Sequence, residues 1–289
     1  ENAPPRKRAL YGSFPQLGAP IGFFFANGTF LLLSWLLTDE QFMSWGWRVP
    51  FILSAVLVII GLYVRVSLHE TPVFAKIAKA GKQVKIPLGT LLTKHLKATV
   101  IGTFIMLATY TLFYIMTVYS MTFSTAAVPV GLGFSRNDVL WMLMMAVIGF
   151  GVMVPIAGYL ADKFGRRKCM IVITSLMIIF ALAVFQPLLG SGNPTLVMAF
   201  LLIGLSLMGL TFGPMGALLP ELFPTEVRYT GASFSYNVAS ILGASVAPYI
   251  ATWLQANYGL FYVGLYLAAM SAITLVALLV SKETRHLSL

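Results

Sequence analysis

Charged residues are scarce in this sequence. Asp, Glu, Lys and Arg make up only 10% of the 289 residues, whereas hydrophobic residues make up 58% and the mean hydropathy is +0.87. In soluble globular domains about a quarter of the residues are charged. The shortage of charge therefore excludes an ordinary soluble domain and indicates a membrane protein.

Cysteine and the usual marks of catalysis are also missing. Cys169 is the only cysteine, which excludes an intramolecular disulfide and a metal site built on cysteines. Paired carboxylates, a histidine cluster, a nucleophile motif and a phosphate-binding loop are all absent from the sequence. We therefore expect no metal and no cofactor. These absences also argue against a membrane enzyme or sensor.

The uncharged residues fall in long runs. A helix that crosses a bilayer needs about 20 apolar residues, and the two longest runs are divided by the turn sequences GSGNP (190–194) and QANYG (255–259). The polar and apolar alternation of β-barrel strands is absent. The sequence therefore predicts an all-α membrane protein with eight transmembrane helices. The expected spans are 13–37, 48–66, 98–122, 138–160, 169–189, 195–218, 232–254 and 260–280.

The net charge of +10 has a topological explanation. If the first segment is cytoplasmic and the sides alternate, 17 of the 19 Lys and Arg residues lie in or beside cytoplasmic segments, and only Arg48 and Arg136 lie outside. This asymmetry is the one that orients membrane helices. We therefore predict that both termini are cytoplasmic, that the chain lies in the lipid bilayer, and that it binds no nucleic acid.

A short motif occurs twice. ENAPPRKR at residues 1–8 and ELFPTEVR at 221–228 both fit Glu-x-x-Pro-x-x-x-Arg, and each precedes two predicted helices that end in Glu-Thr. Transporters are commonly built from such duplicated units, although chance placement of charges beside helices is the alternative. Because four helices precede the second copy, we expect four more ahead of the first.

The duplication divides the chain into three parts. We expect 1–66 to be the last two helices of an amino-terminal six-helix bundle, 67–97 a cytoplasmic loop, and 98–289 a complete carboxy-terminal six-helix bundle.

Several segments resemble one transporter family. GYLADKFGRRK (158–168) resembles the Gly-x-x-x-Asp-Lys/Arg-x-Gly-Arg-Arg/Lys loop of the major facilitator superfamily. PELFPTEVRYTG and the Glu-Thr ends resemble its sugar-porter branch, and ENAPPRKRALYGSFPQLGAPIG and LHETPVF are similar to the bacterial metabolite:proton symporters. The resemblance implies a place in the bacterial cytoplasmic (inner) membrane. It also implies a cytoplasmic gate motif made of Gly158, Asp162, Gly165, Arg166 and Arg167.

The gate motif has a physical role that its residue types suggest. Gly165 permits a sharp bend because it lacks a Cβ atom. A carboxylate at Asp162 can pair with an arginine and can face the positive end of a helix. The two-fold relation between halves predicts that this helix is the one opening at Gly12, Ser13 and Phe14, with Ser13 as its cap.

The duplicated motif also supplies charges at the cytoplasmic helix ends. We expect these charges to form an ion-pair latch, that is, a set of pairs that forms in one conformational state and breaks in another. Single surface pairs contribute only about 0 to 1 kcal/mol, so their role would be to bias the conformation rather than to hold the fold together. The alternative is that they merely mark the membrane boundary. The expected latch residues are Glu1, Arg8, Glu70, Glu221, Arg228 and Glu283.

Polar side chains within the spans are the candidates for a substrate cavity. In a bilayer such groups face a cavity or another helix, and the sequence leaves both readings open. The candidates recur at helical spacing on the first, third and seventh spans. They are Gln16, Asn27, Thr103, Tyr110, Tyr114, Asn237 and Ser240.

Titratable residues are absent from the middle of every predicted span. Proton coupling needs a buried group whose protonation shifts a conformational equilibrium. We therefore expect that group, and any cation that recognises a carboxylate substrate, in the four helices ahead of residue 1.

Together the patterns predict a monomeric secondary active transporter. It would move a small organic metabolite, a carboxylate or a zwitterion, by proton-coupled alternating access, with the proton as coupling ion. An exporter or uniporter of the same fold is the alternative.

Overall fold

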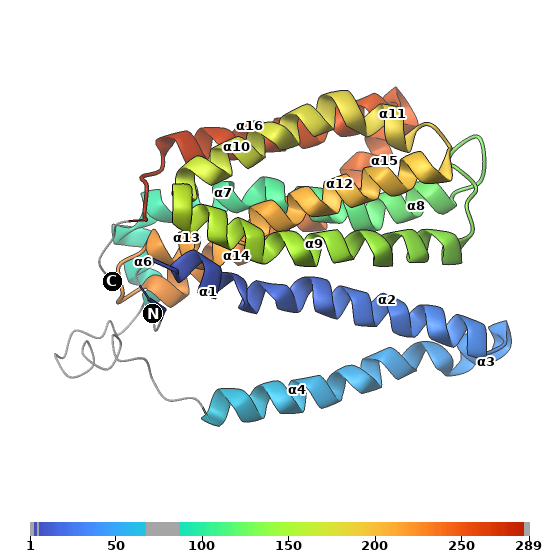
Figure 1. Ribbon diagram of the computed structural model, residues 1–289, viewed down its shortest axis with the longest axis horizontal. Helices are drawn as coiled ribbons and strands as arrows, with labels where there is room; N and C mark the ends of the chain where they lie inside the picture. Colours follow the sequence, from blue (N-terminus) through green and yellow to red (C-terminus); the bar gives the residue numbers. More distant parts are fainter. Residues whose placement is uncertain (1–2, 5, 68–86, 286–289) are drawn as a thin grey trace.

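Eight long helices dominate the computed structural model, which describes residues 3–4, 6–67 and 87–285 (Figure 1). Each is long and apolar enough to cross a bilayer, and the described residues contain no strand. The predicted fold class and number of spans are thus confirmed. The spans are Arg8–Leu36, Gly46–Ser67, Leu96–Thr125, Arg136–Phe164, Arg166–Leu189, Pro194–Glu221, Arg228–Tyr258 and Leu260–Val280.

Most spans consist of shorter helices joined end to end. The first two spans and their connection comprise α1 (Arg8–Ser13), η1 (Pro15–Leu17), α2 (Gly18–Leu36), α3 (Asp39–Ser44), η2 (Gly46–Arg48) and α4 (Val49–Ser67). The rest comprise α6 (Pro87–Lys94), α7 (Leu96–Tyr114), η3 (Ile115–Tyr119), α8 (Ser120–Thr125), α9 (Arg136–Phe164), α10 (Arg166–Ile179), η4 (Phe180–Val184), α11 (Phe185–Leu189), α12 (Pro194–Phe212), α13 (Met215–Glu221), α14 (Arg228–Ser240), η5 (Ile241–Ser245), α15 (Ala247–Tyr258) and α16 (Leu260–Val280). The segments η3, η4 and η5 are π-helical turns.

The helices after residue 95 pack around a common apolar core. Phe150, Phe180 and Phe200 are buried in it, on three different spans. Helices α9 and α12 approach closely because of glycine: a Cβ atom on Gly209 would lie 2.4 Å from the Phe150 carbonyl oxygen. Small residues at helix contacts are typical of membrane proteins, where lipid gives no hydrophobic drive for helix association. Helix α9, which is part of this core, is also the helix that the first span contacts.

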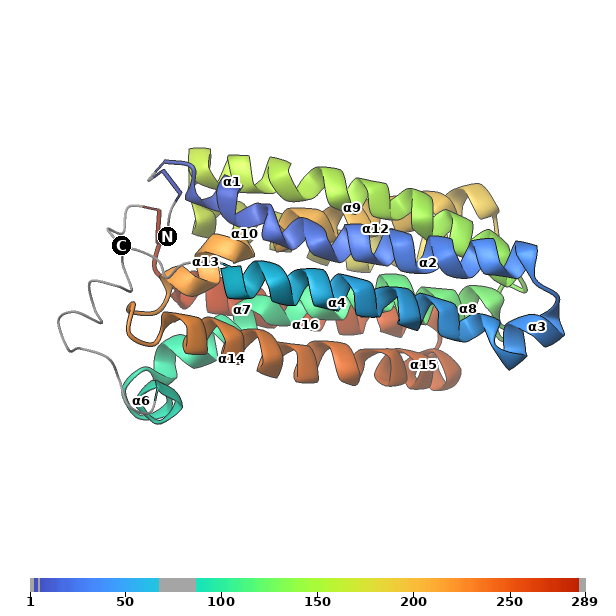
Figure 2. The same cartoon turned by 90° about the horizontal axis from the view of Figure 1, so that it is seen from below.

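The first span lies along α9. Both α1 and α2 contact α9, and α1 also contacts α13 (Figures 1 and 2). Helix α4 has no buried residue, and in Figure 1 it runs apart from the other spans, joined to α2 through α3. Contact between the first two spans and the rest therefore runs mainly through α1 and α2.

Several span boundaries differ from the predicted ones. The first span begins at Arg8 rather than at residue 13, and the seventh covers Arg228–Tyr258 rather than 232–254. Two helices end where the sequence has a glycine, a residue that commonly ends helices. Helix α9 stops at Gly165, with φ +105°, and α15 stops at Gly259, with φ +98°. The early start of the first span depends on Asp162, a residue of the fourth span.

Candidate functional site

The carboxylate of Asp162 binds the first turn of α1. Its Oδ1 accepts a hydrogen bond from the Ala9 backbone N–H at 3.0 Å, and its Oδ2 accepts one from Leu10 at 2.8 Å. The first N–H groups of a helix have no partner within the helix, and a negative charge there is stabilised by the helix dipole. Asp162 therefore acts as a cap supplied from another span.

The helix end that Asp162 meets lies one turn earlier than expected. The sequence predicted a start at Gly12, Ser13 and Phe14, but α1 begins at Arg8, and the Ser13 hydroxyl donates to the Leu10 carbonyl at 2.7 Å instead of capping. The reason is that Asp162 satisfies the early amides, which lets the helix start before the apolar run. The prediction of Ser13 as the cap is wrong.

Arg166 joins the gate motif to the latch. Its Nη2 atom lies 3.2 Å from Asp162 Oδ1 and 3.3 Å from Glu221 Oε1, and its side chain is 1% exposed. Glu221 Oε2 also accepts a hydrogen bond from the Thr284 hydroxyl at 2.5 Å. Buried charges need such pairing to offset the cost of leaving water. We call Asp162, Arg166, Glu221, Glu283 and Thr284 the gate cluster.

Glu283 binds backbone rather than an arginine side chain. Its Oε1 and Oε2 accept hydrogen bonds from the backbone N–H groups of Arg166 and Arg167, at 2.9 and 3.1 Å, at the start of α10. The Arg167 guanidinium in turn donates to the carbonyls of Leu278 and Leu279 at the end of α16. The segment after α16 is thus tied to the α9–α10 turn.

Two of the expected latch residues, Glu221 and Glu283, are held in different ways. Glu221 pairs with Arg166, and the ion pair expected of Glu283 is replaced by a helix cap, because the α10 amides face its carboxylate. Arg228 Nε donates to the Phe223 carbonyl at 3.4 Å. Two more latch residues, Glu1 and Glu70, lie outside the described residues.

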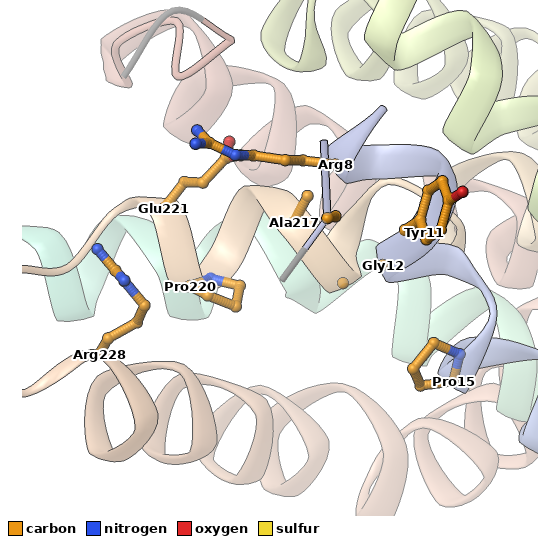
Figure 3. Close-up of a pocket in the computed structure, with 10 residues that line it drawn as sticks. Arg8, Tyr11, Gly12, Pro15, Ala217, Pro220, Glu221 and Arg228 are labelled. Carbon is orange, nitrogen blue, oxygen red and sulfur yellow. The ribbon is translucent and has the colours of Figure 1, made fainter. Parts of the chain in front are cut away.

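Arg8, Glu221 and Arg228 line one pocket of about 510 Å³ between α1, α13 and α14. Figure 3 shows Arg8 extending toward Glu221 from α1, with Arg228 on the other side of the pocket. The pocket lies at the end of the spans where α1 begins and α16 ends (Figure 1). Basic and acidic groups from separate helices thus meet at this end.

Glycines allow α1 to sit directly against two helices. A Cβ atom on Gly158 would lie 2.8 Å from the Ala9 carbonyl oxygen, and one on Gly216 would lie 2.0 Å from that of Gly12. Backbone therefore meets backbone at α9 and at α13. Such a contact contains few interlocked side chains, so its two surfaces can separate without repacking a core.

Two of the cavity candidates share a cavity. Asn27 on α2 and Tyr114 on α7 both line a space of about 470 Å³, together with Thr117, Thr122 and Arg136 and with apolar side chains of α2, α7, α8 and α9. Arg136 opens α9, whereas Asp162 is near the other end of that helix. The cavity and the gate cluster therefore lie toward opposite ends of α9.

The other cavity candidates lie elsewhere. Gln16 donates from Nε2 to the Tyr236 hydroxyl at 2.7 Å, which links η1 to α14. Asn237 is exposed and donates to the Ser233 carbonyl of its own helix. Thr103 is buried, and Tyr110 and Ser240 are half-buried. None of these five residues is among those that line the cavity of Asn27 and Tyr114.

Sequence reasoning missed Tyr236, Thr284 and the placement of Arg136 in the cavity wall. Tyr236 lies 220 positions from Gln16, and no local pattern joins them. Arg136 did carry a signal, because a cation in the first turn of a helix opposes the helix dipole.

The fold and the site define a helical membrane protein in which the first span docks on the later spans through polar and glycine contacts. The chain belongs to the Major Facilitator Superfamily, whose family model matches residues 1–230 and 116–288. This membership places it among transporters rather than enzymes, and it is an integral membrane protein.

Individual relatives agree with the family. The chain is 86% identical over its whole length to the inner membrane metabolite transport protein YhjE of Escherichia coli, and covers 66% of that protein. It is 31% identical to the glycine betaine/proline/ectoine/pipecolic acid transporter OusA of Dickeya dadantii, over 99% of this chain and 58% of OusA. The chain thus spans about two thirds or less of these relatives.

A solved structure shares the fold. The proton:xylose symporter XylE, bound to 6-bromo-6-deoxy-D-glucose, superposes with a TM-score of 0.73, over 98% of this chain and 66% of XylE. The sequence identity is 18%, so this likeness concerns the fold alone.

Proposed function

We propose that this chain works in a secondary active transporter of the bacterial inner membrane that moves a small organic metabolite by alternating access. The observation that carries the proposal is the arrangement along α9. The gate cluster closes one end, where Asp162 caps α1, and the cavity of Asn27 and Tyr114 lies toward the other end. Both features lie between the first span and the later bundle, so one rocking motion would affect both.

The strength of the contacts fits a switch. Net contributions of hydrogen bonds to charged groups are about 1.5–3 kcal/mol each, and a two-state equilibrium is inverted by about 5.5 kcal/mol. The two Asp162 hydrogen bonds join α1 to the later spans, whereas the Arg166 ion pairs lie within the later spans, so ligand binding has only a few contacts to offset. The gate cluster would thus bias the equilibrium without locking it.

The proposed substrate carries a carboxylate, as an anion or a zwitterion. The cavity volume of about 470 Å³ falls within the usual range of small-molecule sites. Every compound in the name of OusA, from glycine betaine to pipecolic acid, has a carboxylate group. That shared chemistry supports the class and leaves the individual compound open.

Proton coupling is the proposed energy source. The symporter XylE shares this fold and is named for its use of protons. One observation favours the alternative, an exporter or uniporter of the same fold: the charged residues of the eight described spans all lie near the span ends. A coupled transporter needs a titratable group that changes partners with conformation.

The test is uptake by liposomes containing the complete gene product. Labelled proline, glycine betaine and simple organic acids would be offered with and without an inwardly directed proton gradient. We expect at least one to accumulate, faster with the gradient and not after a protonophore. Equal uptake under both conditions would favour the uniporter, and no uptake of any metabolite would contradict transport of this class.

A further inference from the structure

Among the residues that the structure describes, Arg136 is the only charged one that lines the cavity of Asn27 and Tyr114. It is the first residue of α9, behind the cap Ser135, whose hydroxyl donates to Asp138 Oδ2 at 2.6 Å. No carboxylate of residues 3–4, 6–67 or 87–285 lines the same wall. The described wall of the cavity therefore carries a positive charge with no negative charge to neutralise it.

Helix geometry does not explain this arginine. A cation in the first turn of a helix is disfavoured by the helix dipole, which places positive charge at that end. Within residues 3–4, 6–67 and 87–285, no hydrogen bond or ion pair involves the Arg136 side chain. The guanidinium thus keeps its five N–H donors for another partner.

Two of the neutral groups on the wall, Asn27 and Tyr114, offer further donors, whereas the two threonines do not. The hydroxyls of Thr117 and Thr122 already donate to carbonyls of their own helices. Asn27 donates one N–H to the Phe23 carbonyl, which leaves its second N–H. The Tyr114 hydroxyl makes no hydrogen bond within the described part of the chain, so it is available as well. The open donors therefore come from α2, α7 and α9.

We propose that Arg136 binds the carboxylate of the transported substrate in this cavity, with Tyr114 and Asn27 as further donors. The inference rests on the proposed transport function and specifies its substrate class. It gives a second candidate for the carboxylate-binding cation, beside the one expected ahead of residue 1. The apolar side chains on the wall, among them Phe23 and Phe113, would cover the body of the substrate. A cationic substrate would meet an unbalanced positive charge.

The test compares charge variants of the complete gene product in liposomes. Arg136→Gln removes the charge and Arg136→Lys keeps it. Arg48→Gln is the matched control, because Arg48 is the other cation predicted on the outer side but binds the Ser44 carbonyl, lies over Trp47 and does not line the cavity. The probes are labelled monocarboxylates and proline, each competed by the unlabelled acid and by its primary amide.

We expect Arg136→Gln to raise the KM for the carboxylate by roughly tenfold or more, the effect of one charge-assisted hydrogen bond, with Vmax changed less than about twofold. Arg136→Lys should keep most of the affinity and Arg48→Gln all of it. In the unaltered protein the amide should compete at least about tenfold more weakly than the acid. This comparison needs no variant and holds even if Arg136→Gln does not fold.

An unchanged KM in folded Arg136→Gln, or equal competition by acid and amide, would overturn the role of Arg136 while leaving transport intact. Failure of all transport would instead count against the proposed function. In that case, the binding of the acids and amides to the detergent-solubilised protein, measured as a thermal shift, would still test the role of Arg136. Preference for the acid that disappears in Arg136→Gln would support it, and absence of preference would sink it.

Discussion

Asp162 holds together two parts of the chain that are 153 positions apart. Its two oxygens bind the α1 amides, and one of them also faces Arg166. The carboxylate is thus shared between a helix end on one side of the interface and a cation on the other. Removing its charge weakens both contacts and leaves Arg166 with Glu221 alone.

Asp162→Asn should therefore open the interface. An amide keeps one acceptor but loses the charge, at a cost of about 1–3 kcal/mol to the state described here, or roughly ten- to hundredfold in its population. We expect transport to fall by about tenfold or more with normal insertion, measured as uptake per molecule in liposomes. Asp39→Asn, at the exposed start of α3, is the control, and equal loss in both variants would contradict a special role for Asp162.

Gly158 is the second residue on which the α1 contact depends. In Gly158→Ala the new Cβ atom would lie 2.8 Å from a backbone oxygen and 3.0 Å from the Leu10 Cα atom. Overpacking of this kind costs about 1–3 kcal/mol, so the melting temperature of the purified protein should drop. Gly22→Ala, in α2 of the span that begins with α1, meets no atom within 4 Å and should leave the melting temperature unchanged. A drop in neither variant would show that α1 does not pack on α9 in this way.

At the scale of elements, the α9–α10 turn shows what the gate motif requires of its backbone. Gly165 has φ +105° and ψ 143°, a conformation that side chains rarely adopt. A Cβ atom there would also lie 2.6 Å from Glu283 Oε2. The turn, the cap of α10 and the segment after α16 thus depend on one glycine.

Gly165→Ala should cost more than a positive φ alone. We expect about 1–3 kcal/mol from strain, with added loss of the Glu283 hydrogen bonds, seen as faster hydrogen exchange at the start of α10. Gly192→Ala is the matched control, because φ is +66° there and no atom lies within 4 Å. Equal effects of the two variants on α10 would show that Glu283 does not hold that helix.

The sequence predicted the elements better than their contacts. The eight spans follow from runs without charge, because a bilayer excludes charged side chains. The gate motif follows from its residue types. The true start of α1 does not, since the partner of its amides is 152 and 153 positions away. Spacing places Asn27 and Asn237 each on a helix face but does not say which face meets a cavity, and Asn237 is exposed.

At the scale of the whole molecule, the distribution of basic residues predicts how the spans sit in the membrane. In a Cys169→Ser background, we expect Ser191→Cys, in the turn after α11, to react with a membrane-impermeant maleimide on intact cells. Lys7→Cys, before α1, should react only after permeabilisation. The opposite pattern would show that the gate cluster faces outward.

The most direct measurement records both ends of the molecule at once. It is the distance between two spin labels at each end, measured by pulsed electron–electron double resonance. One pair, at Lys7 and Phe164, reports on the gate end, and the other, at Met43 and Val128, on the cavity end; all four side chains are exposed. We expect Asp162→Asn to add a longer distance at the gate end and a shorter one at the cavity end. Distances that stay unchanged, or that lengthen at both ends together, would contradict alternating access through this interface.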